Sequence, residues 1–255
     1  MKPITIIANW KMNLTLQESI ALAEAVEQRV RTLPERISVL LCPSFTALPS
    51  VQALVRTCLL GAQDVFWEER GAYTGEIAPR MLRELGCRAV IIGHSERRAH
   101  CGETDAMVRQ KVAATIAAGL IPIVCVGETR AERDEGKKEQ IVHHQVVEAF
   151  SGKLSGTFAS PVYIAYEPVW AIGSGNAVEP TEAEQMHALI LHALRESFSQ
   201  EVIDKSFRVL YGGSVDRRNV AGLLAEPHIA GCLVGGASQN VKDFCALLEA
   251  VTNIA

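Results

Sequence analysis

A carboxylate at the end of an apolar run is the first candidate for chemistry. Glu167 follows Val162–Ala165, and Pro168 biases it toward an extended backbone. Four apolar residues then lead into Gly173–Gly175. An apolar tip between a proline and glycines is typical of a lid that excludes water from a site. An ordinary loop behind a solvated glutamate explains the same stretch, Tyr166–Gly175, equally well.

Other polar side chains also stand directly after strand-like runs. Asn9 and Lys11 follow the first run, His94 the fourth, and Glu128 the fifth. A lone strand-end lysine is usually solvated, and a lone histidine is usually structural. If the strands are parallel, however, all these groups share one edge with Glu167. A base, an imidazole, an ammonium and an amide at one edge indicate a catalytic site.

Two glycine-rich turns predict a phosphate site. Gly212-Gly213-Ser214 follows the seventh run and Gly235-Gly236 the eighth, where barrels frequently bind phosphate through backbone amides. Glycine lets the main chain approach the anion closely. The G-x-x-x-x-G-K-[ST] nucleotide loop does not occur in the sequence. We therefore expect a small phosphoester rather than a nucleotide.

Two other kinds of site are less well supported. Gly93–Arg97 and Gly212–Asp216 resemble the serine hydrolase motif G-x-S-x-G, but each lacks the final glycine. Metal ligands on a helix are typically four residues apart, whereas His143-His144 are adjacent and His187 and His192 are five apart. We interpret all four as surface or packing histidines and predict no metal site.

The elements that position these residues alternate along the chain. Eight apolar runs are each followed by a polar or helical stretch, and the runs are continuous, as in a parallel sheet covered by helices. Eight such units without a composition break favour a single-domain (β/α)8 TIM barrel over residues 1–255. The predicted strands are Ile4–Ala8, Ile37–Leu41, Leu59–Gln63, Ala89–Ile92, Leu120–Val126, Val162–Tyr166, Phe207–Tyr211 and Cys232–Val234.

Helical periodicity marks the segments between these strands. Apolar residues recur there at steps of three or four, which gives each helix one apolar face. The first turn lacks the G-x-G-x-x-G of a dinucleotide-binding sheet, which also favours the barrel. The predicted helices are Leu16–Val30, Thr46–Val55, a short helix from Met81, Met107–Ala118, Ala131–Phe150, Glu182–Phe198, Arg217–Leu224 and Val241–Val251.

Composition and charge indicate the compartment and the kinds of partner that the protein can have. The net charge of −4 gives no basic footprint for nucleic acid. Seven cysteines form no C-x-x-C pair, and those in apolar runs predict buried reduced thiols in a reducing compartment. Strand-like sequence begins by Ile4, and no apolar run approaches the length of a membrane span. We therefore expect a cytoplasmic protein.

Six strings resemble the triosephosphate isomerase family, in family order along the whole chain. They are NWKMN (9–13), GAYTGEIAP (71–79), GHSERR (93–98), AYEPVWAIGSG (165–175), YGGSV (211–215) and LVGGAS (233–238). The resemblance implies that dihydroxyacetone phosphate and glyceraldehyde 3-phosphate are interconverted through an enediolate, without cofactor or metal. It also implies a Glu base and a neutral His electrophile, which fall on Glu167 and His94.

The resemblance implies further roles around the site. Lys11 would offset charge on the phosphate and enediolate, and Asn9 would donate to a substrate oxygen. Trp170 would swing with the lid between Tyr166 and Glu128, and Tyr211 would latch the closed lid. Ser95 and Glu96 belong to the supporting residues, and Gly173, Ser214, Gly235 and Gly236 would hold the phosphate. The lid itself would comprise Pro168, Val169, Trp170, Ala171, Ile172, Gly173, Ser174 and Gly175.

The long polar segment Asp64–Ala78 is longer than a simple connection, which marks it as functional. In the resembled family this loop inserts into a twofold partner, so a homodimer is expected. Thr74 would approach the partner subunit's Asn9, and Glu76 would pair with the partner subunit's Arg97. Met12 and Gln63 would belong to the same interface.

Some residues depart from the pattern of the resembled family, which leaves room for a divergent paralogue. Ser174 replaces a more usual threonine, Leu191 and Ala230 replace a common salt bridge, and Asn240 replaces a common lysine. An isomerase of a four-carbon ketose phosphate could use the same residues. A glycosidase using Glu128 and Glu167 would leave Lys11 and the glycine pairs unexplained. A non-catalytic barrel would have no reason to keep base, histidine and lysine together.

Overall fold

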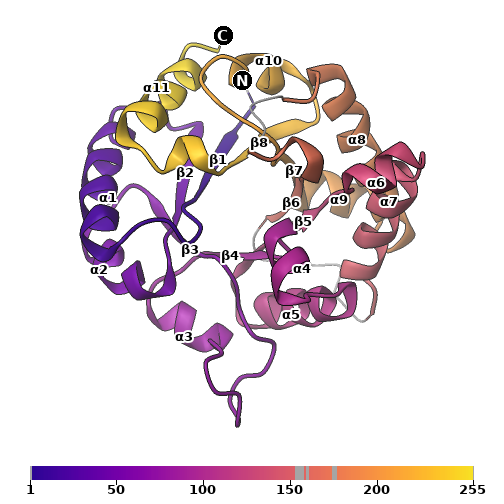
Figure 1. Cartoon of the computed structure of the whole chain (residues 1–255), viewed down its shortest axis with the longest axis horizontal. Coiled ribbons are helices and arrows are strands. Elements are labelled where there is room, and N and C mark those ends of the chain that lie inside the picture. The colour runs from indigo at the N-terminus through magenta and orange to yellow at the C-terminus, as the bar shows by residue number, and fades with distance from the viewer. Residues whose placement is uncertain (1, 153–157, 159–160, 174–176, 255) are drawn as a thin grey trace.

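The chain folds into one closed barrel of eight parallel strands ringed by helices (Figure 1). A computed structural model describes residues 2–152, 158, 161–173 and 177–254. Each strand pairs with the next one in sequence, and the last pairs with the first. This confirms the predicted TIM barrel. The strands are β1 (Ile4–Asn9), β2 (Ile37–Cys42), β3 (Leu59–Ala62), β4 (Ala89–Ile92), β5 (Ile121–Val126), β6 (Val162–Tyr166), β7 (Phe207–Tyr211) and β8 (Ile229–Val234).

The helices cover the outer face of the barrel, as the ring in Figure 1 shows. Thr15 and Thr129 each form a capping box with a glutamate three residues later, which fixes the start of α1 and α6. The helices are α1 (Leu16–Val30), α2 (Leu48–Leu54), α3 (Pro79–Glu84), α4 (Ser95–Cys101), α5 (Asp105–Ala117), α6 (Arg130–Asp134), α7 (Lys138–Ala149), α8 (Pro180–Ala193), α9 (Gln200–Ser206), α10 (Val220–Ala225) and α11 (Val241–Thr252).

The core has two layers because both faces of every strand are covered. Alternate strand residues such as Ile7, Leu40 and Ile123 fill the inside of the barrel, whereas Ile6 and Leu41 pack outward against the helices. This explains why the strands read as continuous apolar runs. The cysteines in these runs are buried and free, as expected. Of the helices described, none has both the length and the apolar character needed to cross a bilayer.

Several helix boundaries differ from prediction. The single helix predicted over Ala131–Phe150 is wrong: it is two helices, α6 and α7, separated at Gly136. Gly136 has φ 71°, a left-handed conformation that ends α6 and that other residues adopt only with strain. Helix α3 begins at Pro79 rather than Met81, since proline suits the first helical position.

Two further differences lie near strand β7. Helix α9 was not predicted, although Ser199 caps it by accepting the Val202 N–H at 3.4 Å. The predicted helix Arg217–Leu224 begins only at Val220, because residues 214–219 form a turn of their own. That turn lies at the mouth of the barrel and contributes to the site described below.

The loop between β3 and α3 stands out from the rim of the barrel at the bottom of Figure 1. Phe66 stacks on Trp67 with ring centroids 4.0 Å apart and packs on Tyr73 at 4.6 Å. The Phe66 N–H also donates to the Ile77 carbonyl at 2.9 Å. An aromatic cluster and a backbone bond therefore brace this projecting loop internally.

A buried carboxylate ties α1 to the start of β3. Glu27 is 3% exposed and accepts the N–H groups of Thr57 and Cys58, both at 2.9 Å. Arg31 Nε also donates to it at 3.2 Å. Burial by itself raises the pKa of Glu27, but the amides of Cys58 and Thr57 outweigh burial and lower it to about 2.

Replacing Glu27 by Gln is expected to lower the free energy of unfolding by about 2–3 kcal/mol at pH 7. A lowered folded-state pKa gives stability that is present above the unfolded pKa and lost as pH falls through the folded one. The difference between wild type and variant should therefore halve by about pH 3. Urea unfolding at both pH values measures it, and a pH-independent difference would contradict the electrostatic explanation.

Candidate active site

A cavity of about 540 Å³ opens at the carboxyl ends of the strands. Residues of β1 and β8 and of the turns that follow β4, β6 and β7 reach it from distant parts of the sequence, as expected for a barrel. The predicted catalytic and phosphate-binding residues all line this one cavity. They are Asn9, Lys11, His94, Glu167, Gly173, Ser214, Gly235 and Gly236.

Glu167 lies at the centre of the site in contact with His94. Its Oε1 is 3.1 Å from His94 Nε2, and its Oε2 accepts the Ser95 N–H at 3.0 Å. Glu167 is 2% exposed and His94 6% exposed, so water is largely kept from the pair. The Glu167 backbone is fixed as well, because its N–H donates to the Val126 carbonyl at 2.7 Å.

The start of helix α4 sets the tautomer of His94. His94 is the N-cap residue, and its Nδ1 accepts the Glu96 N–H at 3.2 Å. Because Nδ1 is occupied as an acceptor, a neutral ring carries its proton on Nε2. That proton faces Glu167 and the cavity. The imidazole is therefore oriented to donate a hydrogen bond into the site.

The pair shifts the pKa values of both groups. Burial lowers the pKa of His94, but the Glu167 carboxylate beside it prevails and raises it. Burial raises the pKa of Glu167, but His94 and the Ser95 amide prevail and lower it. While Glu167 contacts the ring, the pair therefore favours a carboxylate and an imidazolium. The Glu96 amide at the start of helix α4 favours the neutral imidazole instead, but it does not prevail.

Lys11 is held at the cavity by backbone geometry and by a carboxylate. Its φ of 53° is the one positive value among the non-glycine residues described. Its N–H donates to Asn9 Oδ1 at 3.0 Å, and its Nζ forms an ion pair with Glu96. A strained backbone at this position indicates that the placement of the ammonium matters.

The glycine turns leave open main chain around the cavity. A Cβ on Gly212 would stand 2.9 Å from Glu167 Cγ, and one on Gly235 would stand 3.3 Å from Lys11 Cε. A Cβ on Gly236 would meet nothing within 4 Å. Glycine is therefore required at Gly212 by its neighbours, whereas at Gly236 it leaves free space for a ligand.

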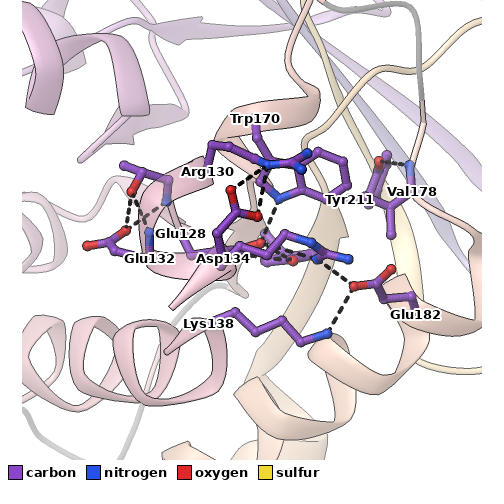
Figure 2. A network of polar contacts seen from close by, with 12 residues as sticks. Glu128, Arg130, Glu132, Asp134, Lys138, Trp170, Val178, Glu182 and Tyr211 are labelled. Atoms are coloured by element: carbon purple, nitrogen blue, oxygen red, sulfur yellow. Dashed lines mark hydrogen bonds and ion pairs between the residues drawn. The ribbon is translucent and has the colours of Figure 1, made fainter. Parts of the chain in front are cut away.

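The predicted lid begins with a short 3-10 turn, Val169–Ala171, directly after Pro168. Trp170 Nε1 donates to Glu128 Oε1 at 2.8 Å, and Figure 2 shows both side chains. The Tyr166 hydroxyl donates to the same carboxylate at 3.1 Å. Glu128 is fully buried, and burial raises its pKa. Of the two predicted partners of Trp170, Glu128 is its acceptor here, and Tyr166 donates to the same carboxylate.

Arg133 extends this network to helix α8. Its guanidinium lies 4.4 Å from the centroid of the Trp170 ring and 2.6 Å from Glu182 Oε1. Lys138 donates to the same Glu182 oxygen at 2.9 Å, as Figure 2 shows. The lid tryptophan is therefore connected to α6, α7 and α8. Arg133, Lys138 and Glu182 were not predicted, because charged helix residues carry no signal that marks them as neighbours of a lid.

Tyr211 contacts the chain just beyond the lid. Its hydroxyl accepts the Val178 N–H at 3.1 Å, which Figure 2 also shows. Ile172 and Gly173 line the cavity, and Gly173 has φ 68°. The predicted lid residues Ser174 and Gly175 lie outside the described residues.

Replacing Trp170 by Phe is expected to speed amide hydrogen exchange at Ala171 and Ile172 about tenfold. The variant loses the indole donor to the buried Glu128, and a hydrogen bond to a charged group contributes about 1.5–3 kcal/mol. Arg130 lies 6.0 Å from the same ring and is exposed, so Arg130→Ala should change exchange less than twofold. Equal exchange in wild type and Trp170→Phe would show that this bond does not hold the lid.

The residues predicted at a dimer interface are not gathered in the same way. Met12, Thr74 and Glu76 are exposed, Met12 at 96%. Gln63 instead donates within the chain, to the Lys11 and Cys42 carbonyls at 2.9 Å each. Its amide therefore also supports the backbone of Lys11.

Arg97 belongs to a cluster of charges under the β3–α3 loop. Its guanidinium is 2.8 Å from Asp64 and 2.6 Å from Glu103. Lys111 Nζ bridges the same two carboxylates at 2.6 and 2.8 Å. Glu103 also accepts the N–H of Gly93, next to His94, at 2.8 Å. The sequence offered no sign of this cluster, since its members lie on three separate segments.

The fold and the cavity together define a barrel enzyme suited to proton transfer on a small anionic compound. A sequence model of the family "Triosephosphate isomerase" matches residues 4–251. The triosephosphate isomerase of Herpetosiphon aurantiacus is 47% identical over 98% of this chain and 99% of its own. Those of Roseiflexus sp. (46%; 98% of each chain) and Moorella thermoacetica (45%; 97% and 98%) are similar.

The chain belongs to the triosephosphate isomerase family. It is an intramolecular aldose–ketose isomerase of glycolysis and gluconeogenesis that interconverts dihydroxyacetone phosphate and glyceraldehyde 3-phosphate. The resemblance drawn from the sequence motifs is thereby confirmed. Its substrate is a triose phosphate.

Proposed function

We propose that Glu167 is the base that moves the proton between the two carbons of the substrate. The contact that carries this proposal is Glu167 Oε1 with His94 Nε2 at 3.1 Å, inside the cavity that the glycine turns also line. Glu167 takes a proton from the carbon next to the carbonyl, which leaves an enediolate, and returns it to the neighbouring carbon, while the substrate's hydroxyl proton passes to the former carbonyl oxygen. A carboxylate is too weak a base for this step unless the enediolate oxygen is stabilised as it forms.

His94 supplies that stabilisation by donating from Nε2 to the reacting oxygen. Once Glu167 turns from the ring toward the substrate carbon, the charge that raised the pKa of His94 has moved away. Burial and the Glu96 amide on Nδ1 then favour the neutral ring. Lys11 adds a positive charge beside the substrate, and Asn9 donates to a substrate oxygen.

The phosphate binds to the main chain of Gly173, Ser214, Gly235 and Gly236. The free space at Gly236 supports this placement. The lid, Pro168–Gly175, closes over the substrate and excludes water, since an enediolate next to a phosphate can otherwise expel it. In this assignment Ser95, Glu96, Glu128, Tyr166 and Tyr211 hold the reacting groups and the lid in position, and the chemistry needs neither cofactor nor metal.

The assembly we propose is a homodimer of single-domain subunits, each spanning residues 1–255, in the cytoplasm. The internally braced loop with its exposed Tyr73 and Thr74 supports insertion into a second copy. Met12, Gln63, Glu76 and Arg97 would border that contact. Sedimentation at assay concentration tests the dimer, and a fully active monomer would contradict it.

Isomerisation in heavy water tests the proton transfer. With dihydroxyacetone phosphate in D₂O, part of the glyceraldehyde 3-phosphate should carry deuterium at C2, because a carboxylate-bound proton exchanges with solvent. NMR of the product measures this label. Product and recovered substrate without any deuterium would point to a hydride shift and contradict the enediolate. A four-carbon ketose phosphate assayed in parallel should have a kcat/KM at least about 100-fold lower; a higher value would favour the paralogue.

A further inference from the structure

One lysine and two arginines line the cavity, and they differ in their partners. Lys11 is paired with Glu96, and the Arg218 guanidinium is held by Asp216, with Nε at 2.8 Å from Oδ2. Arg217 is exposed and has no carboxylate within ion-pair distance in the part of the chain that the structure describes. It therefore offers the one cavity-lining positive charge that no described carboxylate offsets.

The turn that carries Arg217 is rigidly braced. Asn219 Nδ2 donates to the Ser214 carbonyl at 3.0 Å, and Asn219 Oδ1 accepts the Asp216 N–H at 2.9 Å. Asp216 Oδ1 in turn accepts the Arg218 N–H at 2.7 Å. These bonds close the turn on both sides of Arg217 and fix its backbone beside Ser214, at the rim of the cavity.

The charge around the cavity otherwise disfavours an approaching dianion. Asp243 lines the cavity without an ion-pair partner among the described residues, Asp216 and Glu167 are paired with Arg218 and His94, and the whole chain carries a net charge of −4. A phosphoester dianion is repelled by such a field at long range. A free guanidinium at the rim offsets this repulsion locally, over about one Debye length.

We propose that Arg217 captures the phosphate of the incoming substrate at the rim and raises both its association rate and its affinity. This inference rests on the proposed placement of the phosphate at Ser214 and the glycine turns. Arg217 adds selectivity for doubly charged phosphoesters over uncharged sugars of the same length, since only the former gain from its charge. It takes no part in the proton transfer.

Ionic strength tests the proposal on Arg217→Gln. At about 10 mM ionic strength, KM for glyceraldehyde 3-phosphate and the inhibition constant of inorganic phosphate should each rise about three- to fivefold, with kcat unchanged. At about 0.5 M salt the difference should fall below about 1.5-fold, because exposed charges are then screened. Arg217→Lys should restore most of the low-salt affinity.

Arg195→Gln is the charge-matched control. Arg195 is exposed and follows α8, which runs back along the barrel, so it lies at the opposite end from the cavity. Identical behaviour of the two glutamine variants at every ionic strength, or a loss of kcat that salt does not change, would overturn the proposal. Gly236→Val tests the phosphate placement separately from the role of Arg217. If it leaves activity and phosphate inhibition intact, the placement itself is wrong.

Discussion

Glu167→Gln is expected to lower kcat by about three orders of magnitude while KM changes less than about threefold. The amide keeps the size and position of the side chain but cannot accept a proton from carbon. The variant still offers an oxygen to the Ser95 N–H, which Glu167 accepts at 3.0 Å. Steady-state assays in both directions, coupled to a dehydrogenase, measure the loss.

Glu201→Gln provides the matched control, because Glu201 is an exposed glutamate on α9 away from the cavity. It should retain wild-type kcat. Circular dichroism should show both variants folded. A Glu167→Gln enzyme with more than a tenth of wild-type kcat would show that another group removes the proton.

Lys111→Met is expected to have the largest effect on stability, about 3–5 kcal/mol. Lys111 is 2% exposed and bridges Asp64 and Glu103, so the variant leaves two buried carboxylates with Arg97 alone. Burial already raises the pKa of Asp64, whereas Lys111 and Arg97 together outweigh burial at Glu103 and lower its pKa. Urea unfolding at neutral pH measures the loss.

The double variant Asp64→Asn/Lys111→Met distinguishes charge imbalance from lost packing. Its cluster retains one carboxylate for one guanidinium, so about half of the lost free energy should return. Glu103 also accepts the N–H of Gly93, which precedes the site residue His94. The kcat of Lys111→Met should therefore fall together with its stability and recover in the double variant. A single variant within about 1 kcal/mol of wild type would show that the cluster contributes little.

The sequence predicts the features that are set by residues close together along the chain. Three strands, including Val162–Tyr166, have the predicted bounds, because an apolar run covered on both faces ends where the chain turns polar. The site residues could be gathered at one end because parallel strands of a barrel open onto one face. The charged residues around Gly136 give no sign of its left-handed turn, so the sequence predicts one helix where the structure has α6 and α7.

Features that depend on distances across the fold were missed. Nothing near Arg133 in the sequence indicates that it lies against Trp170, 37 positions further along the chain. Lys111 likewise reads as a surface lysine of α5. Arg97 was expected to serve a partner subunit, yet within the chain it already pairs with Asp64 and Glu103. Whether a residue faces the core, the site or a neighbour is decided by packing that local pattern does not encode.

The pairing of β1 with β8 also bears on how the protein is made. The two strands pair through Thr5–Ala8 of β1 and Gly231–Val234 of β8. The sheet therefore cannot close until residue 234 has left the ribosome. Until then the nascent chain carries two unpaired strand edges, at β1 and at the most recently made strand. Exposed edges of apolar parallel strands readily pair with other chains. Slowed translation ahead of Ile229 should therefore lengthen the period in which this protein needs a chaperone.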